Sequence, residues 1–202
     1  MRTINKDSKI TIEITKSIFH SIMRHVDNVN DAKAFFQEIK EEYPNATHYC
    51  TAYVIGKNGE YGHYNDDGEP SGTAGMPMFD VLRKNDLTNV AVVVVRYFGG
   101  IKLGAGGLVR AYSKSVSENL KVAEVVEIIE YKFIKLSFDY SILKLVERNL
   151  DDAEIVSRHF DLDVTLFIKT PSTNVLNIAN RMVNLTSNLA KISILDKIET
   201  NG

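Results

Sequence analysis

Hydrophobic and polar positions in the first part of the chain follow the periods of both strands and helices. Apolar positions that alternate with polar ones, or cluster in β-rich runs, predict strands over residues 10–14, 17–26, 48–55 and 61–64. An apolar face that repeats every three to four residues predicts helices over residues 32–43, 76–84 and about 107–121. Asn30 or Asp31 is the expected cap of the first helix. The run at 90–95 is apolar on both faces, which is typical of a central strand.

The pattern restarts after residue 130. Strands are predicted over residues 131–138, 154–160, 163–169 and 189–195, and helices over 140–150 and 171–185. This βαββαβ order is that of a ferredoxin-like sandwich. We therefore predict an α+β protein with two domains, 1–130 and 131–202.

Composition and charge narrow the class of protein. The 202 residues carry a formal net charge of −2, so any binding of nucleic acid must come from a local basic patch. Cys50 stands alone, which excludes a disulfide within the chain and fits a reducing compartment. The first residues lack the apolar stretch of a signal peptide, and the apolar run at 90–95 is too short to span a bilayer. We expect a cytoplasmic protein with no membrane partner.

A glycine-rich basic segment lies between Asp86 and Glu118, a stretch that contains no acidic residue. Glycine lets the backbone approach a ligand closely, and free N–H groups at the start of a helix favour negative charge. We predict an anion- or nucleic-acid-binding site here, with a tight turn and a solvated helix face as the alternative. The predicted site residues are Arg96, Gly99, Gly100, Lys102, Gly104, Gly106, Gly107, Arg110 and Lys114.

An acidic loop, residues 66–75, precedes the second helix. It has three carboxylates within four residues, a composition that suits Mg²⁺ but also contains the turn formers Asp-Gly and Glu-Pro. Ser71 or Thr73 can cap the helix that follows. A structural loop is the favoured interpretation, and no metal or other cofactor is assigned. If the loop folds beside the basic segment, one pocket would hold both signs of charge, with Asp66, Asp67, Glu69, Ser71, Thr73 and Tyr97 as its residues.

His48 and Cys50 share one face of a predicted strand, because strand side chains alternate. Two such residues without further histidines or cysteines nearby make a poor zinc site. Packing within the sheet is the favoured interpretation for both.

The acidic loop and the glycine-rich basic segment resemble motifs of a known family. Residues 66–75 read DDGEPSGTAG, and residues 95–104 and 106–113 read VRYFGGIKLG and GGLVRAYS. These motifs strongly resemble the YigZ/IMPACT family over about the first 120 residues, and the second part is similar to the family's bacterial C-terminal domain. Ile18 is a departure, because the family usually has arginine after the preceding Lys-Ser.

The resemblance implies a first domain like a small-subunit ribosomal protein, as in the fourth domain of elongation factor G. It implies a ferredoxin-like second domain, as in the fifth domain of that factor. Eukaryotic relatives regulate translation initiation under amino-acid stress by binding a larger activator protein.

Three functions follow as hypotheses. The favoured one is a translation-associated regulatory or binding protein that contacts RNA or a ribosome-linked protein through the glycine-rich basic segment. The second is an enzyme acting on a small phosphorylated ligand, with a Mg²⁺ ion at the acidic loop and no catalytic residue assigned. The third is a protein-interaction regulator without nucleic acid. Sequence-specific DNA binding is not expected.

Overall fold

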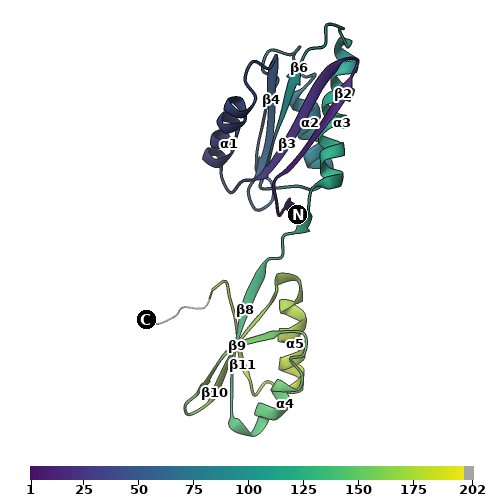
Figure 1. Cartoon of the computed structure of the whole chain (residues 1–202). Coiled ribbons are helices and arrows are strands. Elements are labelled where there is room, and N and C mark those ends of the chain that lie inside the picture. The colour runs from purple at the N-terminus through teal and green to yellow at the C-terminus, as the bar shows by residue number, and fades with distance from the viewer. Residues whose placement is uncertain (198–202) are drawn as a thin grey trace. The chain divides into compact units, whose positions relative to one another are not determined.

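The computed structural model describes residues 1–197, and the chain divides into two compact units, Met1–Ile128 and a second that begins at Ile129. Each unit has its own hydrophobic core and combines antiparallel strands with helices (Figure 1). The predicted α+β class is therefore confirmed. No helix within residues 1–197 combines the length and the apolar character needed to cross a membrane.

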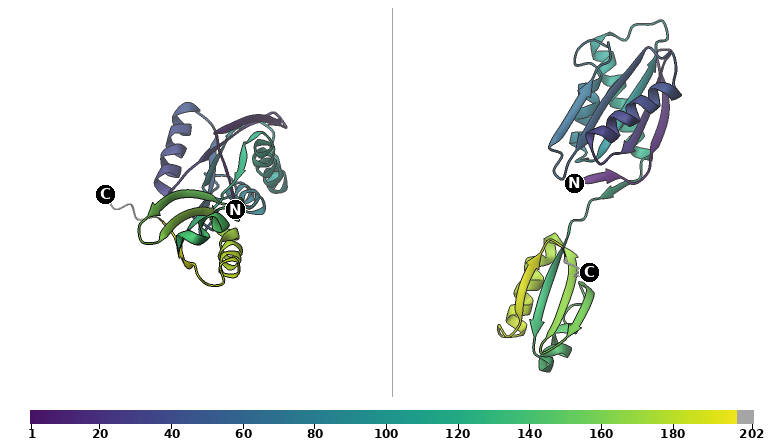
Figure 2. Two further views of the ribbon diagram at one scale, coloured as in Figure 1. Left: turned by 90° about the horizontal axis from the view of Figure 1, so that it is seen from below. Right: turned by 90° about the vertical axis from the view of Figure 1, so that its left-hand side faces the viewer.

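The first unit is built on one five-stranded sheet in which every neighbouring pair is antiparallel. In spatial order the strands are β2 (Ser8–Ile14), β3 (Ser17–His25), β6 (Val90–Tyr97), β4 (His48–Ile55) and β5 (Tyr61–Asn65). One face carries α1 (Val29–Glu42), and the other carries α2 (Gly75–Lys84) and α3 (Gly104–Val122), as Figure 2 shows. The apolar run of β6 is the central strand, as predicted.

Side-chain alternation along β6 divides the core of the first unit in two. Val92 and Val94 face α2 and α3, whereas Val93 and Val95 face α1. All four are fully buried, because helices cover both faces of the sheet. Arg96 continues the first series and Tyr97 the second, so these neighbours point to opposite faces.

The sequence pattern did not predict two short strands. β1 (Arg2–Ile4) pairs antiparallel with β7 (Val125–Glu127), which brings the two ends of the first unit together. Three residues are too few to show a period, so hydrophobic patterning could not predict them.

The structure corrects three predicted helix boundaries. The cap of α1 is Asn28, whose side chain accepts the N–H groups of Asn30 and Asp31, so the predicted caps lie inside the helix. α3 begins at Gly104, three residues earlier than expected, so Gly104, Gly106 and Gly107 lie in its first turn. The helix predicted over 140–150 is a 3₁₀ turn followed by the short α4 (Leu143–Glu147).

The second unit has the strand order of a ferredoxin-like sandwich. Its four antiparallel strands are β11 (Lys191–Leu195), β8 (Tyr131–Phe138), β10 (Val164–Pro171) and β9 (Glu154–Phe160). α4 and α5 (Val175–Leu185) pack on one face of this sheet (Figure 1).

Candidate functional site

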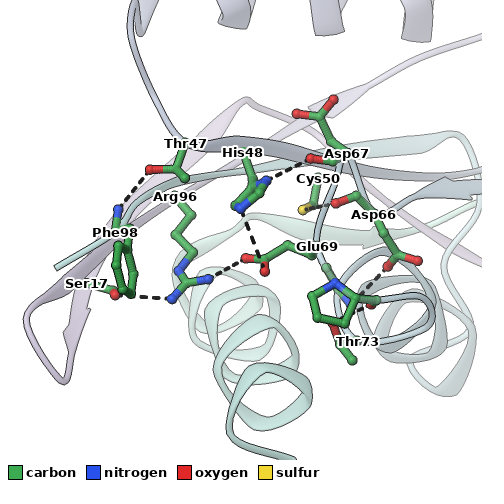
Figure 3. Close-up of polar contacts among 12 residues, drawn as sticks. Ser17, Thr47, His48, Cys50, Asp66, Asp67, Glu69, Thr73, Arg96 and Phe98 are labelled. Atoms are coloured by element: carbon green, nitrogen blue, oxygen red, sulfur yellow. Dashed lines mark hydrogen bonds and ion pairs between the residues drawn. The ribbon is translucent and has the colours of Figure 1, made fainter. Parts of the chain in front are cut away.

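A buried ion pair joins the acidic loop to the central strand. The Nη1 atom of Arg96 donates to Oε1 of Glu69 at 2.6 Å, and the two residues are only 5% and 8% exposed. Tyr112 of α3 donates its hydroxyl to the same carboxylate oxygen at 2.7 Å. The Nη2 atom of Arg96 donates to Oγ of Ser17 at 3.3 Å (Figure 3). Glu69 is therefore held by two donors from two different elements.

His48 lies beside this pair, because β4 places it directly opposite Arg96 in the sheet register. Its Nδ1 atom lies 2.8 Å from the carbonyl oxygen of Asp67. A carbonyl can only accept, so Nδ1 carries the proton. The other ring nitrogen, Nε2, faces Oε2 of Glu69 at 3.8 Å (Figure 3). The imidazole is thus fixed in orientation, with Nε2 toward the carboxylate.

These groups line a hollow of about 380 Å³, which we call the first hollow. Its polar lining includes His48, Glu69, Arg96 and Lys102, and its apolar lining includes Pro70, Phe98, Leu103 and Leu108. The start of α3 also contributes, through Gly104 and Ala105. The first N–H groups of a helix carry partial positive charge, so the hollow combines cations with one carboxylate.

A second hollow, of about 450 Å³, lies along α3. It is lined by Ile14, Thr15, Lys102, Leu103, Gly107, Arg110, Ala111 and Lys114. We call Lys102, Arg110 and Lys114 the basic surface. None of the three forms a salt bridge within residues 1–197, and all three are exposed. Lys102 lines both hollows.

The other residues of the acidic loop hold its own backbone. Asp66 accepts the N–H groups of Gly72, Ala74 and Gly75 at 2.8–3.0 Å, which satisfies donors at the start of α2. Asp67 accepts the N–H of Tyr49 at 2.7 Å. These carboxylates are occupied by backbone donors, and residues 1–197 contain no cluster of three metal-ligating side chains.

Ser71 and Thr73 do not line the first hollow. Thr73 is buried and donates its hydroxyl to the carbonyl of Pro70 at 2.6 Å, while Ser71 is exposed. The acidic loop is therefore a scaffold that positions Glu69.

The predicted pocket is only partly assembled as expected. Glu69, Arg96 and Lys102 meet at the first hollow, but Arg110 and Lys114 line the second. Tyr97 was assigned to the pocket and lies instead on the α1 face, where its hydroxyl donates to the carbonyl of Pro44. The reason is the alternation of side chains along β6, which sends Tyr97 away from the face that holds Arg96.

The predicted glycines fall into two groups. A Cβ at Gly99 would lie 2.0 Å from the carbonyl oxygen of Lys16, so this position has no room for a side chain. Gly100 and Gly104 have φ of +83° and +70°, a region that glycine occupies without strain. Gly106 and Gly107 lie within α3. The segment is therefore a constrained turn followed by the first helical turn.

Sequence reasoning missed part of the first hollow. His48 and Thr47 line it from β4 and the residue before it, and Phe98 lines it from the turn after β6. The available signal was that His48 and Arg96 lie at the ends of neighbouring antiparallel strands. Using it requires the register, which the sequence alone does not supply.

Cys50, the neighbour of His48 on the same strand face, is buried and donates its Sγ–H to the carbonyl of Asp66. Burial raises the pKa of its thiol far above the ordinary value. The predicted packing role fits this environment, because a thiol with a raised pKa is a poor nucleophile.

Comparison with known proteins identifies the class of protein to which this fold and site belong. The family model for the Impact N-terminal domain matches residues 15–120. The IMPACT family member YvyE of Bacillus subtilis is 43% identical over 179 residues, covering 87% of this chain and 82% of the relative. The IMPACT family member YigZ of Escherichia coli is 34% identical, covering 86% and 87%.

A solved structure, described as the crystal structure of a hypothetical protein, is 31% identical and covers 98% of both chains with a TM-score of 0.63. The chain belongs to the IMPACT family, which confirms the resemblance seen in the acidic loop and the glycine-rich segment.

Proposed function

We propose that this IMPACT family member is a translation-associated regulatory protein that contacts RNA through the basic surface. The observation that carries the proposal is the arrangement of Lys102, Arg110 and Lys114 around one hollow without a salt bridge among residues 1–197. Cations that form no salt bridge are available to phosphate groups. The association with translation is inferred from the eukaryotic relatives, which the family resemblance implies to be regulators of translation initiation.

The geometry favours phosphates over bases at this surface. Arg110 and Lys114 are one helical turn apart on α3, and Lys102 precedes the helix at the same hollow. Neutralising about three phosphates of a single strand gives a slope near −2 in a plot of log affinity against log salt concentration. We therefore expect weak binding that decreases steeply as salt is added.

A titration of fluorescently labelled single-stranded RNA at several salt concentrations tests this proposal. The variant Arg110→Ala, Lys114→Ala is expected to bind more weakly and with a slope about 1.4 smaller in magnitude. The control variant Lys33→Ala, Lys84→Ala also removes two exposed cations from the first unit, but from α1 and α2, and is expected to bind like the wild type. Equal affinity and equal slope for all three proteins would reject RNA binding by the basic surface. A protein-interaction regulator would then be the better hypothesis.

A second candidate function, the binding or conversion of a small phosphorylated ligand, is favoured by the first hollow. His48 Nε2 and Glu69 Oε2 face each other at 3.8 Å beside Lys102, which is an arrangement suited to moving a proton near an anion. Inorganic phosphate is expected to raise the melting temperature of the wild type and of Arg110→Ala, Lys114→Ala, but not of His48→Ala. An equal rise in all three would place phosphate elsewhere.

A further inference from the structure

Within residues 129–197, helices cover only one face of the sheet in the second unit. The core of this unit, with α4 and α5, lies on the face that carries Ile134, Leu136, Leu166 and Ile168. The opposite face, which we call the open face, is formed by the alternate residues of the same strands. Figure 1 shows both helices on one side of this sheet. The open face therefore presents side chains that no element of the second unit's core buries.

The two central strands place aromatic and basic residues alternately on the open face. Phe133 of β8 lies directly opposite Lys169 of β10, and Lys135 of β8 lies opposite Phe167 of β10. The two phenylalanines thus occupy one diagonal of a four-residue square, and the two lysines occupy the other. Diagonal neighbours in a sheet are about 7–8 Å apart, so both rings belong to one continuous surface. Both phenylalanines are partly exposed.

Lysines contact two of the aromatic rings on the open face, those of Phe167 and Tyr131. Lys135 Nζ lies 5.8 Å from the centre of the Phe167 ring, and Lys169 Nζ lies 4.5 Å from the centre of the Tyr131 ring. Lys191 of β11 adds a third cation, opposite Ser137. Among the strand residues of this face, the one carboxylate is Glu154, at 3.7 Å from Lys169 on the outer strand β9. The centre of the open face is therefore positive as well as aromatic.

This combination selects one class of partner. Planar rings suit the stacking of unpaired bases, and lysines beside them suit the phosphates that connect those bases. An apolar protein surface would instead bury the charge of Lys135 without a partner and leave Lys169 with Glu154 alone. Aromatic side chains on a four-stranded βαββαβ sheet are also the arrangement by which RNA-recognition modules stack two or three bases.

We propose that the open face binds single-stranded RNA, with bases stacked on Phe133 and Phe167 and phosphates held by Lys135 and Lys169. This site lies outside the two hollows and uses none of their residues. The identification of the single strand as RNA rests on the proposed function. The stacking of bases on Phe133 and Phe167 does not depend on it.

A tryptophan reporter tests the stacking directly, because the chain contains no tryptophan. Phe167→Trp places the fluorophore on the open face. Phe160→Trp is the matched control, since Phe160 is an exposed phenylalanine of β9 that pairs with Val164 on the opposite face. An eight-residue oligoadenylate RNA is expected to quench Phe167→Trp and to leave Phe160→Trp unchanged. An abasic oligomer of the same length and charge is expected to quench neither.

Affinity measurements separate this site from the basic surface. Phe133→Leu, Phe167→Leu is expected to weaken oligoadenylate binding roughly 5- to 150-fold for each lost stack, with the salt slope unchanged. Phe160→Leu serves as the control and is expected to bind like the wild type.

Failure of the proposed function would be seen in a different variant, Arg110→Ala, Lys114→Ala, whose salt slope would then equal that of the wild type. The open-face proposal is overturned if Phe167→Trp is not quenched, or if the abasic oligomer binds as tightly as oligoadenylate. If Phe133→Leu, Phe167→Leu does not fold, the quenching of Phe167→Trp decides the question.

Discussion

Glu69 and Arg96 form an ion pair with a separation of 2.6 Å, and their side chains are only 4% and 6% exposed to solvent. The pair connects a surface loop to the central strand of the first unit. Burial of both charges is costly, and the attraction between them offsets that cost only while both partners are present. The first hollow therefore depends on a polar contact at the end of an otherwise apolar strand.

Removal of either partner is expected to destabilise the protein by about 3–5 kcal/mol, because it leaves an uncompensated buried charge. Urea unfolding of Glu69→Leu, Arg96→Met and the double variant measures this. The double variant is expected to lose much less stability than the sum of the two single variants. Additive losses would show that the pair does not act as a unit. Lys121→Ala is the control, since its pair with Glu118 is solvent-exposed and is expected to contribute less than about 1 kcal/mol.

Asp66→Ala is expected to cost about 2 kcal/mol, because the backbone N–H of Gly72 in the loop and those of Ala74 and Gly75 at the start of α2 lose their acceptor. Urea unfolding measures the loss. Asp80→Ala is the control, since Asp80 is an exposed residue in the middle of the same helix. Equal stability of the two variants would show that Asp66 does not cap α2.

Stability is expected to fall in alkaline solution. Burial raises the pKa of the Cys50 thiol and of the Tyr112 phenol above their ordinary values of 9.0 and 10.0. The unfolded chain releases these protons first, so the stability they contribute is complete below about pH 9 and is lost as the pH rises further. Each group contributes a slope of up to about 1.4 kcal/mol per pH unit.

Urea unfolding between pH 8 and pH 11 measures this loss. Cys50→Ala is expected to show a shallower fall just above pH 9, whatever its stability at neutral pH. Tyr112→Phe is expected to show a shallower fall only above about pH 10. Identical slopes for the wild type and both variants would mean that neither group controls the alkaline limit.

Two glycines near the first hollow are expected to respond to alanine with opposite signs. Gly104→Ala forces a side chain into a backbone with φ of +70° and is expected to cost about 1–2 kcal/mol. Gly106→Ala lies within α3, with only the end of the Arg110 side chain near its Cβ, and is expected to gain about 0.5–1 kcal/mol. Thermal unfolding of the two variants checks the signs, and a loss in Gly106→Ala would contradict the open space seen there.

Local patterns predicted those elements whose apolar residues repeat clearly. The run of valines in β6 is buried on both faces, and β4 has the predicted bounds, because their side chains alone decide their environment. The α1 cap was placed two or three residues too late, since Asn28, Asn30 and Asp31 are all suitable caps and only the backbone distinguishes them.

The site was harder to predict, because it depends on register and on hydrogen bonds between distant segments. The sequence grouped Asp66, Asp67 and Glu69 as three equivalent carboxylates, but each has a different partner: the α2 N–H groups, Tyr49 and Arg96. It also grouped Arg96 with Tyr97, which β6 sends to opposite faces. Charge patterning correctly marked the two loops, but it could not assign the individual contacts.

The position of β6 also constrains how the first unit folds. The hairpins β2–β3 and β4–β5 each connect neighbours in sequence, but they join each other only through β6, which is made later. Because synthesis proceeds from the N-terminus, a nascent chain that has reached residue 65 has two separate hairpins, with unpaired edges on β3 and β4. The edges of β3 and β4 remain unpaired until β6 has been synthesised up to residue 97. β1 remains unpaired for longer, until β7 has been synthesised. The first unit of this protein can therefore close only near the end of its own synthesis.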